Sequence, residues 1–117
     1  MPARIENTIP ILSVRSLSAS IDYYTNALGF KVDWMDGSMA SVSRDGHGLM
    51  LCEGAQGQPG TWVWVGVNDA QALFEELTSR KAIILQSPTN HAWALEMQVS
   101  DPDGHVLRFG SDPSEDT

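Results

Sequence analysis

Residues 42–51 read VSRDGHGLML, and residues 99–109 return to the same pattern as VSDPDGHVLRF, with one residue inserted. Each copy places an Asp-Gly turn between two runs of apolar and small residues, which is typical of a β-hairpin. An internal repeat constrains the architecture before any single residue is interpreted. It predicts two similar modules whose equivalent positions share one cleft.

The first half of the chain is predicted to form a strand, a helix and three further strands. Residues 8–15 read as the opening strand, and apolar residues then recur at helical spacing until Gly29 ends the helix. Ser16 or Ser18 is placed to cap that helix. The remaining strands are expected at residues 30–34, 39–43 and 48–53, with turns at Asp36-Gly37 and Asp45-Gly46.

The second half repeats this order after a Gly- and Pro-containing linker. Residues 61–67 open it as a strand, and Asn68 with Gln71 three residues later resembles a helix cap. An apolar stripe follows, made of Ala70, Leu73, Phe74 and Leu77. The closing strands are expected at residues 82–86, 93–100 and 105–110.

The length of 117 residues allows one domain with one core, so the two modules must pack against each other. We therefore predict a single α+β domain over residues 1–117. Its parts are module one at about 8–53, a linker at 54–60, module two at about 61–110 and a frayed acidic tail at 111–117.

The charge balance bears on the partners that the chain can bind. A net charge of -8 argues against a nucleic-acid partner, because Lys and Arg supply most of that affinity, and it favours a cationic one. Cys52 is the only cysteine, so no internal disulfide can form. No apolar run approaches the roughly 20 residues needed to cross a bilayer, and the N-terminus does not resemble a signal peptide. We expect a cytoplasmic protein without a membrane partner.

Four segments carry a resemblance to a known family, and together they span residues 9–110. They are Leu12–Val14 with the following Ser20–Tyr24 and Leu28–Phe30, then Trp62–Val65, Trp93–Met97 and Asp101–His105. The chain resembles the vicinal oxygen chelate superfamily, which includes glyoxalase I, extradiol dioxygenases and bleomycin-resistance proteins. The resemblance implies two tandem βαβββ modules, each curled into a half-open trough and paired in a dimer.

Catalytic members of this superfamily hold a divalent metal with one residue from each opening and each closing strand. The resemblance maps these positions onto Ile9, Met50, Trp62 and Arg108, and the repeat pairs Ile9 with Trp62 and Met50 with Arg108. Ile and Trp side chains offer no metal donor, Met offers a soft thioether, and Arg is a permanent cation. We therefore predict no metal and no other cofactor.

Strand alternation assigns side chains to the trough. Val63, Val65 and Val67 should face the helix, which places Trp62 and Trp64 on the opposite face. The predicted ligand-binding residues are Ile9, Ile11, Trp34, Met50, Cys52, Trp62, Trp64, His91, Trp93 and Arg108. Such an apolar, aromatic lining suits a flat or cationic organic ligand. For Arg108, pairing with Glu53 or Glu96 and clamping an anionic group on a ligand remain alternatives.

Three functions are compatible with these residues. The leading hypothesis is a non-catalytic homodimer that binds a small organic molecule, similar to the bleomycin-resistance group. The second is a lyase, isomerase or dioxygenase of the same superfamily that recruits metal donors from Glu53, His91 or Glu96. The third is a dimerising interaction module without a ligand. His47 and His105 are assigned structural roles beside their turns, and Cys52 is interpreted as a buried small side chain rather than a nucleophile.

Overall fold

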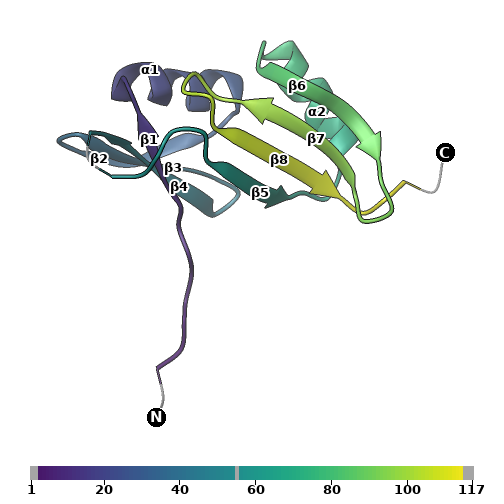
Figure 1. Cartoon of the computed structure of the whole chain (residues 1–117), viewed down its shortest axis with the longest axis horizontal. Helices are drawn as coiled ribbons and strands as arrows, with labels where there is room; N and C mark the ends of the chain where they lie inside the picture. The colour runs from purple at the N-terminus through teal and green to yellow at the C-terminus, as the bar shows by residue number, and fades with distance from the viewer. Residues whose placement is uncertain (1–2, 55, 115–117) are drawn as a thin grey trace.

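The computed structural model describes residues 3–54 and 56–114 and contains two four-stranded sheets, one in each half of the chain (Figure 1). The strands of the first sheet are β1 (Ile11–Val14), β2 (Lys31–Asp36), β3 (Met39–Arg44) and β4 (His47–Glu53). Their spatial order is β1-β4-β3-β2, with β1 parallel to β4 and the other neighbours antiparallel. The helix α1 (Leu17–Asp22) connects β1 to β2 through a short π-helical segment, η1 (Tyr23–Ala27).

The second sheet has the same topology. Its strands are β5 (Trp62–Gly66), β6 (Ile83–Asn90), β7 (Leu95–Ser100) and β8 (Val106–Ser111), and α2 (Ala70–Ser79) connects β5 to β6. The order β5-β8-β7-β6, with β5 parallel to β8, reproduces the order of the first sheet. The prediction of an α+β fold built from two tandem βαβββ modules is therefore confirmed.

The helix of module one differs from the continuous α-helix that its apolar spacing predicts. Ser16 caps α1, accepting the Ala19 N–H at 3.2 Å, but the α-helix ends at Asp22 and becomes π-helical. The wider turn lets two consecutive side chains, Tyr23 and Tyr24, both reach module two. A π-helical segment is rare and depends on such tertiary contacts, which the sequence pattern does not reveal.

The predicted cap of the second helix is wrong by one residue. Asp69, rather than Asn68, is the N-cap of α2, and its carboxylate accepts the Ala72 N–H at 3.0 Å. An acidic cap is favoured here because it also interacts with the positive end of the helix dipole.

Several strand ends also differ from their predicted positions. β1 begins after Ile9, β6 continues to Asn90, and β7 begins after Trp93, so Ile9 and Trp93 lie in segments that precede strands. β8 includes Ser111, and Ser114 and Asn90 exchange two hydrogen bonds of 2.9 Å. Residues 115–117 of the predicted frayed tail lie outside the described residues.

One hydrophobic core serves both modules. Strand alternation works as predicted, because Leu12, Leu51 and Leu107 are fully buried and Val63 and Val65 pack against the same cluster. Among the described residues, the buried members of this cluster are Leu12, Val14, Leu17, Tyr24, Leu28, Ala40, Val42, Leu49, Leu51, Leu77, Met97, Val99, Leu107 and Phe109. Neither module can unfold without exposing apolar surface of the other.

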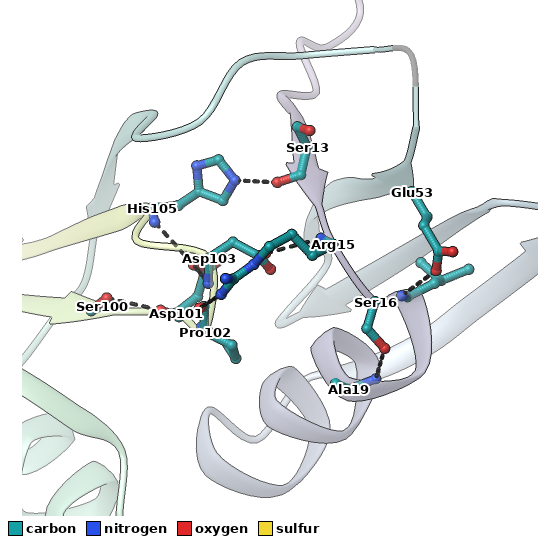
Figure 2. A network of polar contacts seen from close by, with 11 residues as sticks. Ser13, Arg15, Ser16, Ala19, Glu53, Ser100, Asp101, Pro102, Asp103 and His105 are labelled. Atoms are coloured by element: carbon teal, nitrogen blue, oxygen red, sulfur yellow. Dashed lines mark hydrogen bonds and ion pairs between the residues drawn. The ribbon is translucent and has the colours of Figure 1, made fainter.

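Hydrogen bonds connect the turn between β7 and β8 to the end of β1 in module one (Figure 2). Arg15 donates its backbone N–H and its Nε to Oδ1 of Asp103, at 2.9 and 3.0 Å. The imidazole of His105, which is fully buried, accepts the Thr61 N–H at 2.9 Å and contacts the Ser13 carbonyl through Nε2. The structural role predicted for His105 is therefore observed, whereas its repeat equivalent His47 is exposed.

Candidate functional site

Three tryptophans are exposed on module two. Trp62, Trp64 and Trp93 expose 57%, 50% and 64% of their surface, although large aromatic side chains are normally largely buried. Trp62 and Trp64 alternate along β5 with Val63 and Val65, which pack toward the core. The first two indoles therefore lie on the face of the second sheet opposite its core side. We call this face the trough face of module two.

The indole of Trp64 lies directly against the backbone of Gly110. A Cβ atom added at Gly110 would come within 2.2 Å of Cη2 and 2.6 Å of Cζ2 of Trp64, so only glycine permits this placement. The Arg108 guanidinium lies on the same indole, with its central carbon 5.4 Å from the ring centroid. This cation–π contact and the glycine together hold the ring in place. Gly110 was missed by the sequence reasoning, although a glycine inside a strand is a known sign of close approach by another group.

The charge of Arg108 is balanced by Glu96, which lies on β7. Arg108 donates Nε to Oε2 of Glu96 at 2.5 Å and Nη2 to Oε1 at 2.9 Å. Glu96 is only 2% exposed, and a carboxylate that is buried to this degree requires a partner. The hydrogen bonds from Arg108 hold the pKa of Glu96 below its ordinary value, against the effect of burial. Of the alternatives for Arg108, the structure shows pairing with Glu96.

The same carboxylate orients the third tryptophan. Nε1 of Trp93 donates to Oε1 of Glu96 at 3.3 Å, and the ring of His91 stacks on Trp93 with centroids 4.4 Å apart and planes at 6°. His91 and Trp93 both lie in the segment between β6 and β7. These contacts therefore orient two side chains that are not part of a strand. Trp64, Arg108, Glu96, Trp93 and His91 thus form one connected chain of contacts, which we call the Trp–Arg–Glu cluster.

The predicted residues of module one lie on a separate sheet. Ile11 and Met50 are register partners on β1 and β4, while Ile9 and Trp34 are exposed on the preceding segment and on β2. Cys52 is only 3% exposed, which agrees with its interpretation as a small buried side chain. The structure thus groups the predicted residues into two sets, one in each module, and their role in binding stays a prediction.

The metal that catalytic relatives of this fold require does not fit the residues present. At the four mapped positions, Arg108 is a cation already paired with Glu96, and the side chains of Ile9 and Trp62 carry no suitable donor. Met50 offers only a thioether. Over residues 3–54 and 56–114, no three His, Cys, Asp or Glu side chains gather closely enough to hold an ion.

The alternative donors have other partners. The Glu53 carboxylate accepts the Leu17 N–H at 2.7 Å at the start of α1, which places it at the positive end of that helix (Figure 2). Glu96 is bound to Arg108, and His91 is stacked on Trp93. These three side chains do not form a metal site.

A hollow of about 370 Å³ lies at the seam between the modules, and none of the three tryptophans is among its lining residues. Its walls include Phe30 and Phe109, and Arg44 and Glu76 form a two-bonded ion pair within it at 2.9 and 2.7 Å. None of the ten predicted ligand-binding residues lines it within the described part of the chain. Because the Arg44–Glu76 ion pair within it joins the two modules, we interpret this region as the joint between them.

Comparison with known proteins assigns the sequence to a family. The model of the Glyoxalase/Bleomycin resistance protein/Dioxygenase superfamily matches residues 4–109. The chain belongs to this superfamily. No curated protein is recognisably similar to it in sequence.

Solved structures of the superfamily share its fold. A bleomycin-binding protein from Streptomyces verticillus, described in complex with copper(II)-bleomycin, is 23% identical with a TM-score of 0.76, and the match covers 97% of this chain and 100% of that one. A second bleomycin-binding protein, complexed with bleomycin, is 19% identical with a TM-score of 0.77 over 92% and 99%. A superfamily member from Nocardioides is 18% identical with a TM-score of 0.77 over 98% and 88%. These likenesses establish the fold.

No helix in the described part of the chain is both long and apolar enough to cross a membrane.

Proposed function

We propose that this protein binds a small organic ligand, without a metal and without catalysing a reaction, on the trough face of module two. The observation that supports this most directly is the Trp–Arg–Glu cluster. Three indoles are exposed to solvent, and two of them are held by contacts to the ion pair of a half-exposed Arg108 with the buried Glu96. Binding pockets for organic molecules combine such apolar surface with a few fixed polar groups. A flat aromatic or cationic ligand suits indole faces.

We propose that a second copy of the chain packs against the exposed apolar side chains of module one and module two. Ile9, Ile11 and Trp34 are exposed on module one, and Trp62 and Trp64 are exposed on module two. Ile11 and Trp34 lie on the two edge strands of the first sheet, β1 and β2, and exposed apolar side chains of this size are typical of an interface or a ligand site where they form a continuous surface. In a homodimer, the trough face of one module would meet that of another, and the ligand would lie between them.

The structural neighbours support an organic small molecule as the class of ligand. Two of them are described as bleomycin-binding proteins, so this fold is able to hold a large organic molecule. Their identities of 19% and 23% do not transfer the ligand itself. Bleomycin is therefore a first probe rather than the expected natural ligand.

Tryptophan fluorescence tests the proposal directly. Titration with bleomycin and with flat aromatic compounds should quench or shift the emission of the wild-type protein, and Trp64→Phe should reduce the affinity. Trp34→Phe tests module one separately, since it removes an exposed indole outside the cluster, and a loss of affinity there would indicate that the ligand also contacts module one. Absence of any spectral change with all of these compounds would contradict the proposed binding function.

Two further measurements separate the alternatives. Light scattering after size-exclusion chromatography should give a dimer, and a dimer that binds none of the compounds would favour an interaction module. Metal analysis of protein purified without chelators should give no stoichiometric ion. A stoichiometric divalent ion would instead favour a superfamily enzyme.

A further inference from the structure

The Arg108 guanidinium has one edge that its protein partners leave open. Nε and Nη2 bind Glu96, whereas Nη1 donates to no side chain or carbonyl among residues 3–54 and 56–114. The side chain of Arg108 is 36% exposed, so this open edge is accessible to a ligand. A guanidinium has five N–H donors and no acceptor, and the open edge can therefore donate hydrogen bonds to an oxygen atom of a ligand.

Glu96 cannot offer the opposite charge to a ligand. Both of its oxygens already accept hydrogen bonds, Oε1 from Arg108 and Trp93 and Oε2 from Arg108. At 2% exposure it is covered by its neighbours. A ligand cation at this point would meet the guanidinium rather than the carboxylate, and like charges repel.

Flat surface lies beside the open edge. The guanidinium is 5.4 Å from the centre of the Trp64 ring, which is itself held against Gly110. A ligand ring placed on the same face of Trp64 as Arg108, over the part that the guanidinium leaves uncovered, would lie side by side with the guanidinium and present its in-plane substituents toward it. Oxygen acceptors in the plane of an aromatic ring match the planar donors of a guanidinium.

We propose that Arg108 selects ligands that carry a carboxylate or carbonyl oxygen on the edge of a flat aromatic ring. This inference rests on the proposed binding function and narrows its ligand class from flat or cationic compounds to flat acceptors. At long range, the net charge of -8 favours cationic ligands over anionic ones, which opposes the preference of Arg108. At 0.15 M salt the screening length is about 8 Å, so the direct contact with Arg108 decides the preference.

Three probes that share one ring system and differ in one substituent test this selection. They are 2-naphthoate, 2-naphthamide and 2-naphthylmethylammonium, and their dissociation constants are measured from the indole N–H signals of the four tryptophans by NMR at 0.15 M salt. We expect 2-naphthoate to bind tightest, by about threefold over the amide and about tenfold over the ammonium compound, because charge-assisted hydrogen bonds are the stronger ones.

A charge-balanced pair of variants isolates the role of the ion pair. The double substitution Glu96→Gln/Arg108→Gln leaves the net charge unchanged and should remove most of the preference for 2-naphthoate. Arg44→Gln/Glu76→Gln makes the same chemical change in the bidentate ion pair at the module seam. This control variant should retain the preference for 2-naphthoate. Far-UV circular dichroism and the dispersion of the indole signals report whether each variant is folded.

The outcomes distinguish this inference from the function on which it rests. If the ammonium compound binds the wild-type protein as tightly as 2-naphthoate, the selection by Arg108 is refuted while the binding function stands. Retention of the full preference by Glu96→Gln/Arg108→Gln would also refute it. If none of the three probes moves an indole signal, both the selection and the binding function are contradicted.

Discussion

The hydrogen bond donated by the hydroxyl of Tyr24 is predicted to make a large polar contribution to the contact between the two modules. Tyr24 is fully buried on η1, and its hydroxyl donates to Oδ2 of Asp101 at 2.9 Å, across 77 residues of sequence. Burial raises the pKa of this hydroxyl well above its ordinary value, and Asp101 raises it further, so it remains a donor at any ordinary pH. The substitution Tyr24→Phe removes this donor and keeps the ring.

The cost of Tyr24→Phe follows from what each atom loses. The ring keeps its edge contact with Phe30 at 5.7 Å, so little packing is lost. Oδ1 of Asp101 keeps the N–H groups of Asp103 and His105, but Oδ2 loses a partner while it is buried. A hydrogen bond to a charged group contributes about 1.5–3 kcal/mol, so we expect a loss of about 2 kcal/mol. For a domain of this size the melting temperature should fall by roughly 8 °C.

Urea unfolding followed by circular dichroism and fluorescence measures this loss. Tyr23→Phe is the comparison, because its hydroxyl binds only neutral backbone groups, the Ser100 carbonyl and the Ile83 N–H, at 2.7 and 2.9 Å. It should cost about 1 kcal/mol. The two probes should give coincident transitions, since the core is shared. A loss below about 0.5 kcal/mol for Tyr24→Phe, or one smaller than that for Tyr23→Phe, would refute the argument.

Three further predictions concern other contacts. Gly110→Ala should displace the Trp64 indole, because the indole is the far end of a half-exposed side chain that has space to rotate away from the added methyl group. The free energy of unfolding should therefore change by less than about 1 kcal/mol, while near-UV circular dichroism and ligand affinity change clearly. A double-mutant cycle on Arg44 and Glu76 should give a coupling of about 1 kcal/mol at pH 7, because the pair is bidentate but partly exposed. Arg44 lowers the pKa of Glu76, so this coupling is fully present above the unfolded value near 4.5 and should disappear as the pH falls through the lower folded value; a coupling that persists at pH 2 would contradict it. The imidazole of His105 accepts the Thr61 N–H at Nδ1, so its ¹⁵N spectrum should show the neutral tautomer protonated at Nε2, and a proton on Nδ1 would contradict the assigned hydrogen bonds.

The sequence predicted the parts of the fold that repeat. The hairpin pattern with its Asp-Gly turns specified the antiparallel strands, and alternation separated Val63 and Val65 from Trp62 and Trp64 correctly. What it did not specify depends on contacts between the halves. The π-helical turn that begins at Tyr23 is an example, because its reason lies in partners on β7 and the turn after it.

The candidate site divides in the same way. Alternation placed Trp64 and Arg108 on one face, but it could not choose between Glu53 and Glu96 as the partner of Arg108. That choice depends on which strands are neighbours: β8 lies between β5 and β7, so Arg108 is in register with Trp64 on one side and Gln98 on the other. Glu53 is instead used at the start of α1. A carboxylate next to a helix N-terminus and a carboxylate next to an arginine look alike in sequence.

The repeat also shows how the ionic chemistry of this trough differs from a metal site. Met50 and Arg108 occupy equivalent positions, each in register with the strand that opens its module, at Ile11 and Trp64. In module two this position carries a cation, and the carboxylate that balances it comes from β7 rather than from an opening or closing strand. Both charges are thereby used within the protein, and a divalent ion would have to displace Arg108 from a buried carboxylate to find a ligand. Of the paired charges in this cluster, Arg108 alone has hydrogen-bonding capacity left, and its open edge donates. If this face binds a ligand as we propose, recognition would depend on the acceptor that the ligand carries.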